Sequence, residues 1–192
     1  MKKLLIGLAI LLVVFFIGRS MYNGLISKDE DVKRTWAEVQ NQYQRRASLI
    51  DNLVSTVKGA ANFEQKTLTD VINARASATQ MKVDINDLTP EKLAAFQASQ
   101  GQLSQALGRL MMITENYPTL KSSELFRDLM ADLSGTENRI AVARKDYNAS
   151  VQTYNTKVRS FPTNIFAGMF GLKTRPTFEA DASSQNAPKV EF

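Results

Sequence analysis

An unbroken alternation of three- and four-residue steps through residues 32–57 constrains the fold of this chain more than any other feature. All members of the series but one are apolar or aromatic: Val32, Trp36, Val39, Tyr43, Arg46, Ile50, Leu53 and Val57. Steps of this size return to one face of an α-helix, so the series predicts a long helix with a coiled-coil seam. A buried Arg46 would need a carboxylate partner, because burying an unpaired charge costs several kcal/mol.

An apolar run over residues 4–18 precedes this seam and follows two lysines. The run has the length of a signal-peptide core, but Gly18 and Ser20 form a poor cleavage site. We therefore expect residues 1–26 to be a retained single-pass transmembrane anchor, the alternative being a cleaved signal. The helix should continue without a break to about Lys58, roughly 60 Å from Arg19. Basic residues flank both ends of the anchor, which leaves the side of the body open.

Three further helices are predicted, over residues 64–81, from Pro90 to about residue 116, and from Ser122 or Ser123 to residue 161. Thr89 is the expected N-cap of the third, and Ile72 and Phe161 are placed on apolar helix faces. Short connections favour antiparallel neighbours. The predicted fold is all-α, an elongated antiparallel four-helix bundle over residues 27–161 whose first helix is continuous with the anchor. Gly101 and Gly108, seven apart, predict a close helix approach.

A Phe-rich segment and a flexible C-terminal tail are expected over residues 162–192, with disorder over residues 180–190. Ile165, Phe166, Met169 and Phe170 fall on one face of a short helix. Because the fourth helix returns toward the bilayer, this face is a candidate membrane-surface contact, with Lys173 and Arg175 suited to anionic headgroups. The alternative is that the same side chains close the base of the bundle.

The composition excludes several classes of chemistry. The 192 residues include no His and no Cys, which removes thiol nucleophiles, Ser-His-Asp triads and His- or Cys-ligated metals. The sequence shows neither a nucleophile–base pair nor a phosphate-binding loop, so we expect no enzymatic activity and no cofactor. The net charge of +5 is spread among interspersed acids and bases, which argues against nucleic acid as a partner.

Antiparallel packing of the first and fourth predicted helices indicates a partner for Arg46. If the first and fourth helices meet at a turn between Gly59 and Ser122, Arg46 faces Glu137, and Glu38 faces Arg144. The second helix then places Arg75 near this level, and the third contributes Gln97 or Gln100. We predict a polar layer across the bundle. Two alternatives are that Arg45 and Arg46 reach solvent, or that the arginines bind an anionic ligand.

Five stretches together resemble the LemA family: QYQRRASLIDNLVSTVKG, LTDVINARA, GQLSQALGRLMMITENYPTLK, LSGTENRIAVARKDYNASVQTYN and FPTNIFAGMFG. The resemblance implies a bacterial protein with one N-terminal transmembrane helix, a helical body, usually placed in the cytoplasm, and no established enzymatic activity. One family member is associated with building internal membrane invaginations, so the resemblance also implies a role in shaping membrane. Ser48 and Asp51 stand where the family tends to have Asp and Pro, and Phe63 stands where it often has His. The polar residues of these motifs form the candidate site: Arg45, Arg46, Asn52, Arg75, Glu137, Arg139 and Arg144.

The functional expectation is a non-enzymatic scaffold in the bacterial inner membrane. It would contact membrane lipids, self-associate as a homo-oligomer, or organise an unidentified membrane protein partner. The alternative is an accessory or sensor subunit of a membrane protease or transporter.

Overall fold

The computed structural model describes residues 2–59, 63–81 and 83–179. These residues form helices and connecting segments and contain no β-strand. The tail predicted to be disordered, residues 180–190, lies outside the described part of the chain. The helices are α1 (Lys2–Lys58), α2 (Gln65–Gln80), a 3₁₀ turn η1 (Ile85–Asp87), α3 (Pro90–Thr114), α4 (Pro118–Lys121), α5 (Glu124–Arg159) and α6 (Thr163–Met169).

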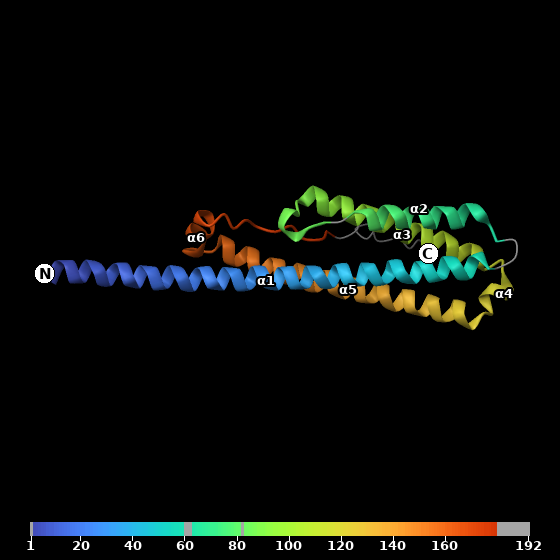
Figure 1. Cartoon of the computed structure of the whole chain (residues 1–192), viewed down its shortest axis with the longest axis horizontal. Coiled ribbons are helices and arrows are strands. Elements are labelled where there is room, and N and C mark those ends of the chain that lie inside the picture. The colour runs from blue at the N-terminus through green and yellow to red at the C-terminus, as the bar shows by residue number, and fades with distance from the viewer. Residues whose placement is uncertain (1, 60–62, 82, 180–192) are drawn as a thin grey trace, which may run out of the picture.

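Helix α1 is one continuous element of 57 residues. Its first part projects alone from the body, and the side chains of residues 4–17 are exposed (Figure 1). Helix α1 is long enough, and near its N-terminus apolar enough, to cross a membrane. The predicted continuity between the anchor and the first helix of the body is confirmed.

The body consists of two antiparallel helix pairs (Figure 1). Helix α5 packs along α1, and α3 packs along α2. Helix α3 begins as predicted at Pro90, where the hydroxyl of Thr89 accepts a hydrogen bond from the backbone N–H of Lys92 at 3.2 Å. Ser123 occupies the N-cap position of α5, although its side chain makes no capping hydrogen bond. The four-residue helix α4 was not predicted.

The buried side chains separate into two cores along the length of the body. The proximal core lies nearer the anchor and includes Val32, Trp36, Phe96, Tyr147 and Phe178. The distal core includes Ile50, Leu53, Leu103, Leu129 and Leu133. All eight seam positions of α1 are buried, and Arg46 lies between the seam residues of the two cores.

Three sequence-based expectations are wrong. A Cβ added at Gly101 or Gly108 would meet no atom within 4 Å, so neither glycine serves a close helix approach. Ile72 lies on the exposed side of α2. Helix α5 ends at Arg159, and Phe161, expected on its buried face, is 81% exposed.

Candidate functional site

Arg46 joins three helices at the level between the two cores. Its Nη1 donates to Oε1 of Glu137 on α5 at 2.8 Å and to the Ser104 hydroxyl on α3 at 3.2 Å. Its Nη2 donates to the backbone and side-chain oxygens of Gln100. The guanidinium carbon lies 5.2 Å from the centre of the Tyr43 ring. The antiparallel register therefore brings Arg46 to Glu137 as expected, with Gln100 as the contribution of α3.

An open cavity of about 460 Å³ lies against this group. Its wall is largely polar and includes Arg46, Gln97, Gln100, Gly101, Ser104, Gln105, Glu137 and Arg144. The empty space at Gly101 belongs to this wall. Two arginines and one glutamate leave the lining with one excess positive charge.

Of the remaining charged members of the predicted polar layer, only Arg144 reaches the wall of this cavity. Arg75 bonds the Asp51 carboxylate and the backbone oxygen of Ala47, so it reaches the same level on another side of α1. Arg45, Asn52 and Arg139 are exposed. Glu38 accepts a hydrogen bond from Gln42 at 2.6 Å on its own helix, while Arg144 faces the C-terminal segment. The polar layer is narrower than predicted, because Arg46 is the only one of its predicted α1 members that is buried.

The segment after α6, residues 172–179, is here called the strap. It has no regular secondary structure and runs back along the body (Figure 1). The side-chain amide of Asn155 exchanges two hydrogen bonds with the backbone of Arg175, both at 2.8 Å. Asn148 does the same with the backbone of Phe178, at 3.0 and 2.9 Å. The strap is therefore held to α5 through its main chain.

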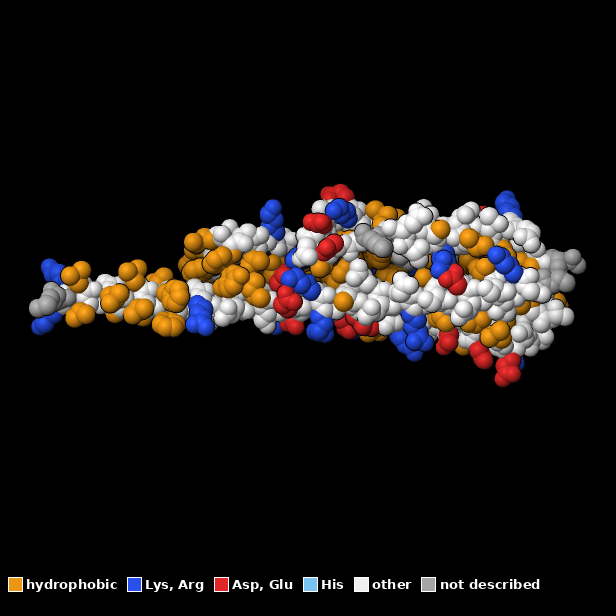
Figure 2. Space-filling view, viewed as in Figure 1, with side chains coloured by type: hydrophobic (Ala, Val, Ile, Leu, Met, Phe, Trp, Pro, Cys, Tyr) orange, Lys and Arg blue, Asp and Glu red, His pale blue; other side chains and the backbone are white. Residues whose placement is uncertain are grey.

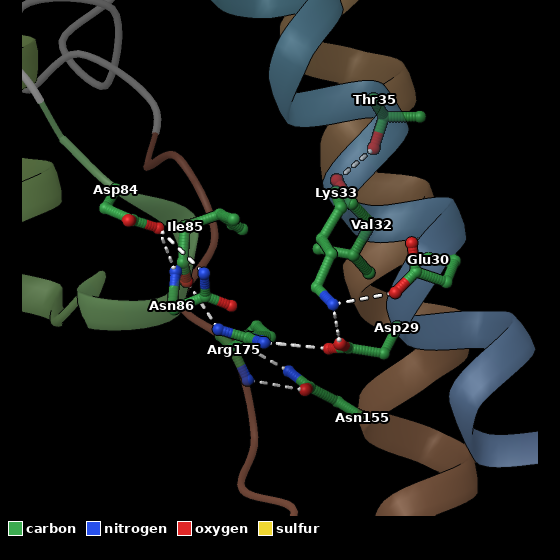
Figure 3. Close-up of polar contacts among 10 residues, drawn as sticks. All are labelled: Asp29, Glu30, Val32, Lys33, Thr35, Asp84, Ile85, Asn86, Asn155 and Arg175. Atoms are coloured by element: carbon green, nitrogen blue, oxygen red, sulfur yellow. Dashed lines mark hydrogen bonds and ion pairs between the residues drawn. The ribbon is translucent and has the colours of Figure 1, made fainter.

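The side chain of Arg175 lies between η1 and α1 (Figure 3). Its Nη2 and Nε donate to Oδ1 of Asp29 at 2.8 and 3.3 Å, and its Nη1 donates to the backbone oxygen of Ile85. The Nζ of Lys33 lies 3.1 Å from Oδ2 of Asp29. Burial alone would raise the pKa of Asp29, but hydrogen bonds and charge from Arg175 and Lys33 outweigh burial, and the pKa is lowered.

Phe178 fills the aromatic part of the proximal core. Its ring stacks on Trp36 at 6.0 Å and meets Tyr147 edge-on at 5.5 Å. The Tyr147 hydroxyl donates to the backbone oxygen of Pro176 at 3.0 Å, and burial raises the pKa of this phenol. The guanidinium carbon of Arg144 lies over the Phe178 ring, 4.7 Å from its centre, and Nη2 donates to the backbone oxygen of Glu179 at 3.2 Å.

Sequence reasoning missed the Asp29–Arg175 pair. Arg175 was expected to meet lipid headgroups, and it instead forms an ion pair with the buried Asp29, which corrects that expectation. The heptad seam, extended toward the N-terminus, would have predicted that Asp29 is buried. A step of three back from Val32 reaches Asp29, and a further step of four reaches Leu25, and both residues are buried.

Helix α6 packs beside α1 at the end of the apolar run. A Cβ added at Gly18 would lie 3.0 Å from the Phe166 ring, and the rings of Tyr22 and Phe170 are 4.7 Å apart. Ile165 and Met169 point outward and are exposed, together with much of Phe170. Figure 2 shows apolar side chains gathered here, next to the projecting anchor. The four predicted residues thus divide between packing on α1 and an outward apolar surface.

Among the described residues, no group of three or more acidic side chains is placed to hold a metal ion. The arrangement offers instead a charged cavity, a groove that holds an extended chain, and an apolar surface beside the anchor.

Comparison with known proteins gives one family and several relatives. The model of the LemA family matches residues 35–192. Magnetosome protein MamQ 2 of Paramagnetospirillum magneticum is 29% identical, over 91% of this chain and 71% of the relative. Magnetosome protein MamQ of Magnetospirillum gryphiswaldense is 29% identical, over 89% and 70%. Protein LemA of Metamycoplasma hominis is 24% identical, over 88% and 73%.

Proposed function

Because the chain belongs to the LemA family, we propose that it is a non-enzymatic scaffold at the bacterial inner membrane, an antiparallel four-helix bundle carried on a single-pass anchor. It meets the bilayer twice, through the apolar part of α1 and through the outward surface of α6. In this role it self-associates or organises partner proteins. The observation that carries the proposal is the position of α6 beside the end of the apolar run.

The outward side chains of α6 fit a lipid surface better than water. Ile165 and Met169 on α6 are exposed, Met169 to 74%, and so is Phe161 just before α6. Burying each of them in lipid would contribute on the order of 1.5–3 kcal/mol. Large apolar groups gathered in one place usually mark a contact surface.

Basic side chains border this surface. Arg19 on α1 and Lys173 at the start of the strap are both exposed. Anionic headgroups attract such residues at roughly 1 kcal/mol each near the surface. Two membrane contacts on one rigid body would fix its tilt. The magnetosome proteins among the relatives lend support to a role in shaping membrane.

The test measures how deep α6 lies in the bilayer. The chain has no cysteine, so Met169→Cys in the full-length protein takes a single environment-sensitive dye. In liposomes containing anionic lipid we expect blue-shifted emission that brominated lipids quench. The matched control is Met112→Cys, an exposed methionine on α3 in the body, which should give neither signal. A Met169 signal that equals the Met112 signal would rule out the second membrane contact.

A further inference from the structure

The groove that holds the strap is the surface of α5 around Asn148 and Asn155, and it binds the main chain of an extended segment. Asn148 and Asn155 are seven residues apart on α5, which corresponds to about 10.5 Å along a helix. Arg175 and Phe178 are three residues apart in the strap, about 10 Å in an extended chain. The two repeats match, so each asparagine amide meets one residue's N–H and C=O. Hydrogen bonds to backbone impose extension but no particular sequence.

Two side-chain sites beside these hydrogen bonds make the groove prefer particular residues in the bound segment. Asp29 and the Ile85 carbonyl take the guanidinium of Arg175. Trp36 and Tyr147 take the ring of Phe178. An extended segment with Arg and Phe three residues apart therefore satisfies every contact. The groove also has room beside the strap, in an open cavity of about 850 Å³ lined in part by Asn148, Gln152, Asn155 and Thr177.

We propose that this groove is a peptide-binding surface whose partner is the strap of a second copy of this chain. The inference deepens the proposed function, on which it rests, by naming the contact through which copies associate. Two copies that exchange straps keep every strap contact described above, so exchange loses little enthalpy. Mutual exchange also gives a closed, two-fold symmetric dimer.

Three features favour a second copy as the occupant. Every copy carries the matching Arg-Pro-Thr-Phe sequence at residues 175–178. Anchors in one membrane would hold the grooves of neighbouring copies at the same height, which raises their effective concentration. The connection from Gly171 to Arg175 spans up to about 13 Å when extended, while packed helices lie about 8–10 Å apart. A strap can therefore reach a groove on an adjoining α5.

The absence of cysteine allows a direct test with full-length protein. Gln152 and Thr177 line the same cavity, so one chain carrying both Gln152→Cys and Thr177→Cys should form an internal link with a short bismaleimide. Two differently tagged chains, each with one of these cysteines, are then co-expressed in one membrane. Exchange predicts a cross-linked heterodimer. Thr153→Cys, which replaces the next residue of α5 and lines a different cavity, is the matched control and should give none.

A second change separates exchange from mere proximity. Asn148→Ala with Asn155→Ala removes four hydrogen bonds that hold a strap in its own groove or in a partner's, so it should lower the internal link and the heterodimer together, each about tenfold or more. A heterodimer that persists while the internal link is lost would overturn the proposal, because the copies would then be close without sharing straps. No heterodimer, with the internal link present, would overturn it as well.

A measurement without cross-linking keeps the test decisive. Trp36 is the single tryptophan and stacks on Phe178, so its emission reports on groove occupancy. Full-length Phe178→Ala should show a saturable change in emission with a synthetic peptide of residues 172–179, and not with a peptide lacking the Arg and Phe side chains. No response to the first peptide would overturn the proposal. None of these readouts depends on lipid contact by α6, so failure of that contact would be seen separately.

Discussion

Arg46 and Arg175 are two ways of placing an arginine inside the same helical body. Arg46 is 2% exposed, but its partner Glu137 is 45% exposed and reaches water. Arg175 is 16% exposed, and its partner Asp29 only 7%. If the bond to Arg46 breaks, water can hydrate the Glu137 carboxylate. If the bond to Arg175 breaks, the Asp29 carboxylate stays out of reach of water. The exposure of the partner, rather than the burial of the arginine, should decide what each pair contributes to stability.

The largest effect is expected at the enclosed pair. Asp29→Ala leaves Lys33 paired with Glu30 but removes the carboxylate that Arg175 bonds, and breaking such a pair typically costs about 3 kcal/mol. Urea unfolding of the detergent-solubilised protein, followed by circular dichroism, gives the free energy of unfolding. Asp31→Ala, two positions along and more exposed, is the control and should cost under about 1 kcal/mol. Equal losses in the two variants would remove the distinction drawn above.

A smaller loss is expected at the open pair. Glu137→Gln keeps the shape of the side chain and leaves Arg46 bonded to Gln100 and Ser104. Since water screens Glu137, we expect a loss of about 1 kcal/mol in the same unfolding experiment. A loss as large as that of Asp29→Ala would show that partner exposure is the wrong criterion.

A gain of about 0.5–1 kcal/mol is expected from Gly101→Ala, because alanine is the better helix former and nothing obstructs the added methyl group. Gly101 lines the cavity at Arg46, whereas Gly108 has the same free space away from that cavity. Gly108→Ala should therefore stabilise equally. Should Gly101→Ala destabilise while Gly108→Ala stabilises, the cavity holds something that the methyl group displaces.

The smallest effect appears only in acid. The pKa of Asp29 is lowered from 3.8 in the folded protein, so its stabilising contribution is complete above that value and is lost as the pH falls through the folded pKa. We expect the difference in unfolding free energy between the wild type and Asp29→Asn to be constant near neutral pH. It should shrink below about pH 4. A difference that is flat to lower pH would contradict the role given to the Asp29 charge.

The seam shows why one arginine site was predictable and the other was not. Arg46 interrupts a regular repeat, and a repeat fixes both the face of a helix and the register of its antiparallel neighbour. Glu137 follows from that register, and the α3 contribution is narrowed to Gln97 or Gln100, of which the structure shows Gln100. Arg175 lies in an extended segment, where no periodicity assigns a side chain to a face, and its contacts come from residues 146 and 90 positions away.

The same limit applies to the strap and to the glycines. Asn148 and Asn155 lie within the motif that marks the family, but their spacing has meaning only once an extended chain lies beside α5. Gly101 and Gly108 were misread because spacing alone does not distinguish a crowded helix face from an open one. Helix boundaries were better predicted, since Pro90 and Thr89 act locally.

The unbroken course of α1 has a mechanical consequence. Residues 27–58 form a stiff arm of about 50 Å between the anchor and the far turn. Rotating the base of such an arm by about 10° sweeps its tip through about 8 Å. Local changes in bilayer thickness or curvature that reorient the anchor would thus arrive magnified at the end farthest from the lipid.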